Sequence, residues 1–153
     1  KLPADRQGFS VSRSVHRLDG TEVKSGTPLR QGDRFVLVMT GETRSEGEQK
    51  ALLVDLLTAG LEIENTRLTH GGSLDDFTLV RDISKLKHTE LRDDRFIAAI
   101  DLDSKGEEFR LAYLVRAVTP GRFVWPAAYI EDMYRPDRFA RGKMGVLDVD
   151  VRR

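Results

Sequence analysis

The stretch Phe109–Pro136, FRLAYLVRAVTPGRFVWPAAYIEDMYRP, decides the predicted fold. Residues 109–116 alternate in character, as in a pleated strand that sends successive side chains to opposite faces. Residues 119–122, Thr-Pro-Gly-Arg, predict a type II turn, because proline sets φ at the first central position and glycine accepts the positive φ at the second. The apolar run Phe123–Trp125 then returns and ends at Pro126, which cannot donate to a sheet ladder. We therefore predict a β-hairpin that is followed by an exposed segment of large side chains.

Strand patterns recur along the rest of the chain. The predicted strands are Phe9–Leu18, Arg34–Thr43, Ala51–Leu57, Leu61–Ile63, Phe96–Leu102 and Val146–Val151. Turns are expected at Asp19-Gly20, at Gln31-Gly32-Asp33 and at Asp103–Gly106, the last closing a hairpin onto the Phe109 strand. From Asn65 to Asp94 the pattern weakens, and we expect one long crossover, irregular or partly helical. The fold class is therefore all-β: a single antiparallel β-sandwich of about seven strands, with residues 1–153 forming one domain.

Balanced charge and the lack of cysteine exclude several classes of function. The chain has 25 basic and 25 acidic residues, so electrostatics give no case for a nucleic-acid partner or for direct contact with an anionic membrane. It has no cysteine, which excludes disulfides, thiol catalysis and cysteine-ligated metals within this chain. No apolar run in the sequence is long enough to span a bilayer. Because the chain begins at Lys1 without a methionine, we expect it to be a piece of a longer polypeptide.

The titratable residues give no pattern typical of catalysis or of a metal site. Adjacent acids on a strand point to opposite faces and are more often solvated than catalytic. The adjacent acids are Asp93-Asp94, Glu107-Glu108 and Glu131-Asp132. The histidines, at positions 16, 70 and 88, lack the spacing of metal ligands. We therefore predict a domain without catalytic residues, metal or cofactor; the enzyme alternative is a carbohydrate-active sandwich that uses Glu131 or Asp94.

Large side chains near the predicted hairpin have two interpretations. For Tyr113 we favour core packing with the hydroxyl bonded to the backbone, and for Trp125 packing at the end of the sandwich. Residues 129–134, Tyr-Ile-Glu-Asp-Met-Tyr, are too apolar for a plain loop. Exposed, they would form a contact surface of the kind that methionine and aromatic residues favour; folded back, they would cap the sandwich. The pattern alone favours neither.

Six phrases span nearly the whole chain. They are FSVSR-x-x-H-R-LDG, QGDRFVLVMTGET, LLVDLLTAGLEIEN, HTELRDDRFIAAIDL, AYLVRAVTPGRF and P-AAYIEDMYRP. In this order they resemble the carboxy-terminal domain of bacterial alpha-2-macroglobulins. The resemblance implies a macroglobulin-like, fibronectin-like sandwich at the carboxy-terminal end of a much longer periplasmic protein, which lipid tethers to the inner membrane.

The resemblance also implies a role in a broad-spectrum protease inhibitor. In this family a protease cuts a bait region, the molecule rearranges, and an internal Cys–Gln thioester on a helical domain is exposed to capture lysines of the protease. This chain has no cysteine and cannot perform the capture step itself. The implied partners are the thioester domain of the same polypeptide, indirectly the target proteases, and other cell-envelope proteins.

The last domain of the family packs on the thioester domain and helps to shield the thioester. By resemblance, the shielding side chains are Met133 and Tyr134, with Tyr129 and Ile130 as supporting contacts. A thioester persists only where water is excluded, and a flexible thioether beside an aromatic ring makes a dry cover. The alternative is a generic fibronectin-like spacer or binding module for an extracytoplasmic partner, which the same residues would then contact.

Overall fold

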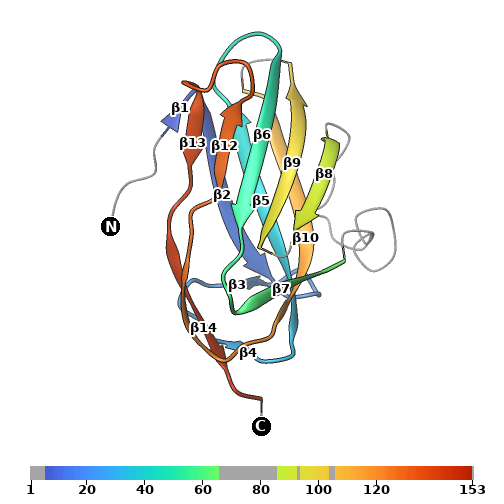
Figure 1. Cartoon of the computed structure of the whole chain (residues 1–153), viewed down its shortest axis with the longest axis vertical. Coiled ribbons are helices and arrows are strands. Elements are labelled where there is room, and N and C mark those ends of the chain that lie inside the picture. The colour runs from blue at the N-terminus through green and yellow to red at the C-terminus, as the bar shows by residue number, and fades with distance from the viewer. Residues whose placement is uncertain (1–5, 66–85, 93, 104–105, 153) are drawn as a thin grey trace.

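Every described element of the chain is a β-strand. The computed structural model describes residues 6–65, 86–92, 94–103 and 106–152, and the regular structure in these ranges is all β (Figure 1). These ranges accordingly contain no helix that could cross a membrane. The strands form three sheets, which confirms the predicted all-β class.

The largest sheet has six strands in the order β1-β13-β12-β6-β9-β8. Its ladders are antiparallel. In sheet order the strands are β1 (Arg6–Gln7), β13 (Phe139–Arg141), β12 (Tyr129–Asp132), β6 (Gln49–Leu56), β9 (Arg95–Leu102) and β8 (Leu86–Arg92). β6 pairs with β9 along its whole length, from Gln49 opposite Leu102 to Leu56 opposite Arg95. β6 also pairs with β12 on its other side, so it is an inner strand.

The second sheet has five strands in the order β3-β2-β5-β10-β7. In sheet order they are β3 (Glu22–Val23), β2 (Phe9–His16), β5 (Arg34–Thr43), β10 (Glu108–Ala117) and β7 (Leu61–Asn65). The central strand, β5, pairs with β2 on one side and with β10 on the other. Its apolar run Phe35–Met39 is buried throughout, as is typical of a central strand.

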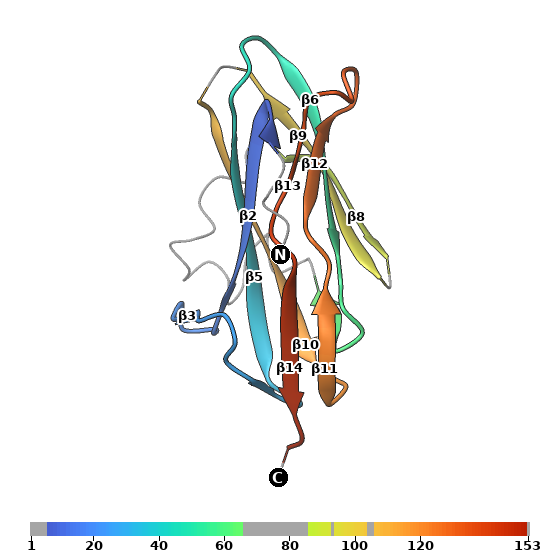
Figure 2. The same ribbon diagram turned by 90° about the vertical axis from the view of Figure 1, so that its left-hand side faces the viewer.

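A short third sheet extends the lower end of the sandwich. It has the order β11-β14-β4, with β11 (Gly121–Trp125), β14 (Gly145–Asp150) and β4 (Leu29–Arg30). β14 pairs with β4 in parallel, whereas β11 and β14 are antiparallel. Figure 2 shows β11 below β12 and β14 below β13. Between the two levels the amide of Gly142 donates to the Ala128 carbonyl over 2.9 Å, so β11–β12 and β13–β14 continue as one long ribbon.

The core lies between two layers, one with β2, β5 and β10 and the other with β6, β9, β12 and β13 (Figure 2). In β6 and β9 buried and partly exposed residues alternate strictly, as expected for a strand with one face on the core. Both layers supply fully buried large side chains, among them Phe9, Leu37, Met39, Leu53, Ile100, Tyr113 and Ile130. Each such apolar side chain contributes about 1.5–3 kcal/mol when it leaves water.

Both predicted hairpins next to the Phe109 strand are wrong. β9 and β10 follow one another in the chain but belong to different sheets, and so do β10 and β11. Each connection therefore crosses from one layer or level to another instead of reversing within a sheet. Turn-forming residues such as Pro120 and Gly121 fit both kinds of connection, and the local sequence does not distinguish them; Gly121, with φ of 140°, already belongs to β11.

The expected crossover from Asn65 to Asp94 ends in a strand. Residues 86–92 form β8, which pairs with β9 in an antiparallel ladder, so the partly helical expectation is wrong for this part. Residues 66–85 lie outside the described residues. The described strands also number fourteen, more than the predicted seven, because several have only two or three residues.

Candidate functional site

The segment that was predicted as an exposed loop begins with an inner strand of the largest sheet. β12 pairs with β6 on one side and with β13 on the other. Ile130 is completely buried in the core, while its neighbours Tyr129 and Glu131 are partly exposed on the opposite face. The prediction of a loop at residues 129–132 is therefore wrong. Pro126 ends the preceding strand, and the local pattern gave no sign that pairing starts again three residues later.

The loop itself connects β12 to β13 and is held by backbone hydrogen bonds. The Met133 amide donates to the Lys50 carbonyl of β6 over 2.8 Å. The Asp132 amide donates to the Arg138 carbonyl over 3.0 Å, and the Arg138 amide donates to the Arg135 carbonyl over 2.9 Å. The loop is thus tied both to its own two ends and to the neighbouring strand.

Two consecutive residues of this loop have large apolar side chains that are exposed to solvent. Met133 is 44% exposed and Tyr134 is 79% exposed. The loop lies at the end of the sandwich opposite the carboxy-terminus, as the connection between β12 and β13 in Figure 1 shows. Two exposed apolar side chains next to one another in the chain make this loop a candidate contact surface. Of the two interpretations of residues 129–134, exposure therefore holds for Met133 and Tyr134, and burial holds for Ile130.

Asp132 shapes the loop through its side chain. Asp132 as a residue is 3% exposed, and its Oδ1 accepts hydrogen bonds from the amides of Tyr134 over 2.9 Å and Arg135 over 3.3 Å. This is the bonding by which aspartate mimics a backbone turn. The interpretation of Glu131-Asp132 as a solvated pair is therefore wrong for Asp132.

Tyr129 lies on the outer face of the sheet, among side chains of its own domain. Its ring stacks on Phe139 with 6.1 Å between centroids, and the Arg141 guanidinium carbon lies 5.5 Å from the Tyr129 centroid. Partial burial and the nearby Glu131 carboxylate raise the pKa of the Tyr129 hydroxyl, and Arg141 opposes this. These contacts fix the ring beside the loop and leave Met133 and Tyr134 as its outermost apolar groups.

A buried polar cluster joins the two layers below the loop. Nη1 of Arg13 lies 2.5 Å from Oδ1 of Asp55, and the Tyr113 hydroxyl donates to the other oxygen of the same carboxylate. Nη2 of Arg13 donates to the Pro126 carbonyl over 2.9 Å, and its guanidinium lies 4.2 Å above the Trp125 ring. Tyr113 does pack in the core, but its hydroxyl bonds to a carboxylate, so the predicted backbone partner is wrong.

Burial governs the titration of this cluster. It raises the pKa of the Asp55 carboxyl, while the charge of Arg13 and the hydrogen bond from Tyr113 act in the opposite direction. Burial and the Asp55 charge raise the pKa of the Tyr113 hydroxyl well above its ordinary value. Asp55 was not predicted from the sequence, although the buried positions of β6, Gln49, Ala51, Leu53 and Asp55, place an acid in the core.

The other candidate residues that the structure describes contact residues close to them in the sequence. Asp94 is exposed and hydrogen bonds to Arg95, while Glu107 accepts from the Asp103 amide. His16 is buried and contacts the Ser14 hydroxyl over 2.8 Å; His70 lies outside the described residues. Within the part of the chain that the structure describes, no cluster of three or more His, Asp or Glu side chains could hold a metal ion.

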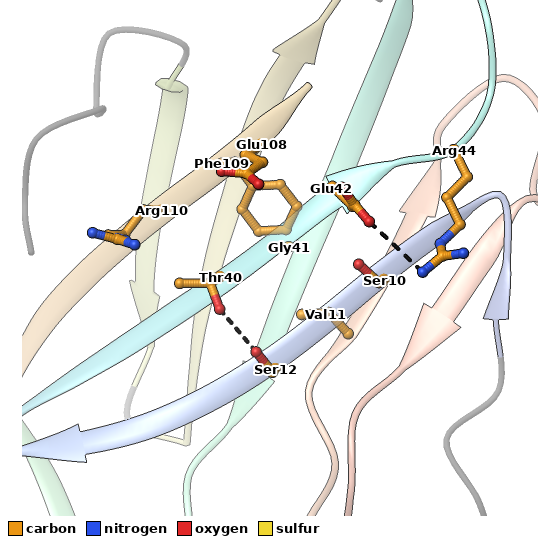
Figure 3. Close-up of a pocket in the computed structure, with 10 residues that line it drawn as sticks. All are labelled: Ser10, Val11, Ser12, Thr40, Gly41, Glu42, Arg44, Glu108, Phe109 and Arg110. Atoms are coloured by element: carbon orange, nitrogen blue, oxygen red, sulfur yellow. Dashed lines mark hydrogen bonds and ion pairs between the residues drawn. The ribbon is translucent and has the colours of Figure 1, made fainter. Parts of the chain in front are cut away.

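A hollow of about 660 Å³ lies at β2, β5 and β10 (Figure 3). Four of its polar side chains form two pairs: the hydroxyls of Ser12 and Thr40 are 2.8 Å apart, and Arg44 lies 3.6 Å from Glu42. Phe109 fills the space over Gly41, which stands opposite it in the ladder. Because these groups pair among themselves, we assign no chemistry to the hollow.

The chain is similar to bacterial alpha-2-macroglobulins. Residues 8–137 match the family described as the bacterial alpha-2-macroglobulin MG10 domain. An alpha-2-macroglobulin of Escherichia coli strain K12 is 39% identical over 149 residues, which make up 92% of this chain but only 9% of that protein.

Solved structures of bacterial alpha-2-macroglobulins contain a domain that is similar to this chain. The crystal structure of native Escherichia coli alpha-2-macroglobulin from domain MG7 to the C-terminus superposes with a TM-score of 0.84 at 32% identity, covering 98% of this chain and 24% of that chain. The Salmonella alpha-2-macroglobulin reacted with methylamine gives a TM-score of 0.83 at 33% identity, covering 97% of this chain and 10% of that chain. This chain therefore belongs to the family of bacterial alpha-2-macroglobulin MG10 domains.

Proposed function

We propose that this domain is a non-catalytic part of a bacterial alpha-2-macroglobulin protease inhibitor, in which it packs on the thioester domain and shields the thioester. Met133 and Tyr134 are the side chains that cover the thioester. The observation that carries this proposal is their exposure, next to one another, on a loop whose backbone is tied to β6 and to its own ends.

A shield for a thioester must exclude water and small nucleophiles. An apolar cover does so when it is densely packed, and the methionine thioether adapts its shape to the surface that it meets. Docking also removes the two side chains from water, which favours the contact by about 1.5–3 kcal/mol for each side chain that becomes fully buried. The loop is therefore suited both to bind a neighbouring domain and to keep the contact dry.

Ile130 and Tyr129 support the cover in different ways. Ile130 is buried in the core of its own domain, so it acts by anchoring β12 and makes no direct contact with a partner. Tyr129 is half-buried against Phe139 and borders the loop from the outer face. Direct contact with the thioester domain falls to Met133 and Tyr134.

The relatives support the chemistry of the proposal. The Salmonella protein was reacted with methylamine, and a primary amine is the kind of nucleophile that opens a thioester. By the same family argument, the parent protein lies in the periplasm with a lipid anchor in the inner membrane. It meets target proteases there, and other envelope proteins are further candidate partners.

Thiol release from the full-length parent protein tests the shield. Methylamine is added to the unsubstituted protein, to Met133→Ala and to Tyr134→Ala, and the released thiol is titrated over time. We expect release about tenfold faster or more in both variants, which corresponds to about 1.4 kcal/mol of lost shielding. Met144→Ala is the matched control, because Met144 is also an exposed methionine but lies outside the loop, directly before β14 of the third sheet.

Two outcomes would reject the shield. Equal rates in all four proteins would remove the role of the loop, and no thiol from the unsubstituted protein would mean a parent without a thioester. In the second case the alternative of a binding module for an extracytoplasmic partner remains, and the same two variants should then weaken binding to that partner.

A further inference from the structure

We infer that Asp132 is a positioning residue, whose buried carboxylate holds the backbone of the β12–β13 loop in the shape that presents the Tyr134 ring. The inference concerns the order of the loop, and its consequence for the thioester rests on the proposed function. It assigns a role to the one acidic side chain of the segment that is buried, at 3% exposure.

Tyr134 needs such a support because its side chain makes few contacts of its own. The ring is 79% exposed, so packing within this domain does not fix its direction. Tyr134 is held instead through its backbone, because its amide donates a hydrogen bond to Oδ1 of Asp132 over 2.9 Å. The same oxygen accepts from the Arg135 amide over 3.3 Å, so one atom orders two consecutive peptide units.

The Arg135 amide has a second bond, to the Asp132 carbonyl over 3.3 Å, and the other ties of the loop hold residues other than Tyr134. The Met133 amide binds the Lys50 carbonyl, and the Arg138 amide binds the Arg135 carbonyl. Both of these bonds join backbone to backbone and survive any change of side chain. The bonds to Oδ1 are the ones that a substitution at residue 132 removes, and they are the ones next to Tyr134.

The chemistry of a carboxylate strengthens this tie. A hydrogen bond to an ionised acceptor is about twice as strong as one between neutral groups. Without Oδ1 the Tyr134 amide would lose its partner, while the Arg135 amide would keep only its 3.3 Å bond to the Asp132 carbonyl. Asparagine, which also forms this turn, can present an equivalent amide oxygen to the same two donors.

Hydrogen–deuterium exchange of the full-length protein tests the inference directly. Peptides that contain the amides of Tyr134 and Arg135 are followed by mass spectrometry in Asp132→Ala and Asp132→Asn. We expect the Tyr134 amide to exchange about tenfold faster in Asp132→Ala, because its bond is lost, and the Arg135 amide to change less, because it keeps its bond to the Asp132 carbonyl. In Asp132→Asn exchange should stay within about twofold of the unsubstituted protein. Asp132→Glu is the second variant if Asp132→Ala fails to fold; it keeps the charge but moves the oxygen, so exchange should also rise.

The matched control is Asp19→Ala. Asp19 makes the same kind of turn, with Oδ1 accepting from the Thr21 amide over 2.9 Å, but between β2 and β3 near the other end of the domain (Figure 1). Asp19→Ala should leave exchange at Tyr134 and Arg135 unchanged. Unchanged exchange there in Asp132→Ala would overturn the inference, and so would an increase that spreads equally to the core strands.

Thiol release separates this inference from the proposed function. If the loop acts as a shield, Asp132→Ala should speed methylamine-driven release toward the rate of Tyr134→Ala, while Asp132→Asn should stay near the unsubstituted rate. A rate that rises in Tyr134→Ala but not in Asp132→Ala would reject the positioning role and leave the shield intact. If neither Met133→Ala nor Tyr134→Ala changes the rate, the shield is rejected, and the exchange data alone decide whether Asp132 orders the loop.

Discussion

Arg13 and Asp55 connect the two layers of the sandwich through an ion pair that is almost hidden from solvent. Nη1 of Arg13 lies 2.5 Å from Oδ1 of Asp55, whose side chain is fully buried. The second nitrogen of Arg13 binds the Pro126 carbonyl, and the second oxygen of Asp55 accepts from Tyr113. With both ends satisfied, the pair recovers part of the cost of removing two charges from water.

Removal of one partner should be far more costly than loss of a surface ion pair. We expect Asp55→Ala to lower the free energy of unfolding by about 3–5 kcal/mol, because the Arg13 charge stays buried without its counter-ion. Arg34→Ala, which breaks a part-exposed pair with Glu64 at 2.8 Å, should cost about 1 kcal/mol or less. Urea denaturation of each variant measures both. Equal losses would contradict the view that the buried pair is the stronger tie.

Tyr113 should make the domain sensitive to alkali. The folded protein holds the Tyr113 proton above pH 10 because the pKa is raised, while the unfolded chain releases it near the ordinary value of 10.0. The unfolded state then binds fewer protons, so this contribution to stability is lost as the pH rises above about 10, by about 1.4 kcal/mol per pH unit. Tyr113→Phe should remove that slope between pH 10 and 12 in urea denaturation. Tyr134→Phe, a change at an exposed ring, is the control and should keep it.

Gly41 should tolerate no side chain. A Cβ at this position would lie 2.2 Å from the Ser10 carbonyl oxygen and 2.4 Å from Cζ of Phe109. Relief of this clash must move the backbone of β2 or the buried Phe109 ring, so Gly41→Ala should destabilise the domain by about 1–3 kcal/mol or more. A Cβ at Gly145 would meet no atom within 4 Å, so Gly145→Ala should change the thermal midpoint little. Similar midpoints for the two variants would show that the β2–β5 ladder adapts.

Substitution of the buried Ile130 should lower the stability of the domain, whereas substitution of the exposed Met133 or Tyr134 should not. Ile130→Ala removes a fully buried side chain and should cost about 2–5 kcal/mol of unfolding free energy. Met133→Ala and Tyr134→Ala should each stay within about 0.5 kcal/mol, since both side chains face solvent. Denaturant midpoints of the isolated domain measure all three. A large loss in Tyr134→Ala would make any change in thiol release a consequence of unfolding.

Periodicity predicted where most strands lie. The Phe109 strand, the Phe96 strand and the final strand all occur, as β10, β9 and β14. In β9 burial of one face imposes alternation on the sequence itself. Periodicity could not assign the strands to sheets. The connections after β9 and after β10 cross between sheets, and that choice depends on which distant strand offers a free edge.

The shielding role of the candidate site stays a prediction, and the structure shows only how exposed its side chains are. Family resemblance pointed to Met133 and Tyr134, and both are exposed. The environments of Asp132 and Asp55 escaped prediction, because an acid is solvated or buried according to partners elsewhere in the chain. For Asp55 that partner, Arg13, is 42 residues away in the sequence. The one local indication that Asp55 is buried is its place among the core-facing positions of β6.

The order of strands within the sheets also governs when this domain can fold during synthesis. During synthesis β6 lacks one of its pairing partners until β12 (Tyr129–Asp132) has been made. In the same way, β4 lacks its partner until β14 (Gly145–Asp150) has been made. A growing chain that ends at Ala117 would leave the core without Ile130, Leu147 and Val149, which are buried in the finished domain. Closing such distant pairs is slow, so the nascent domain should remain open, and dependent on protection from aggregation, until nearly all of it has emerged.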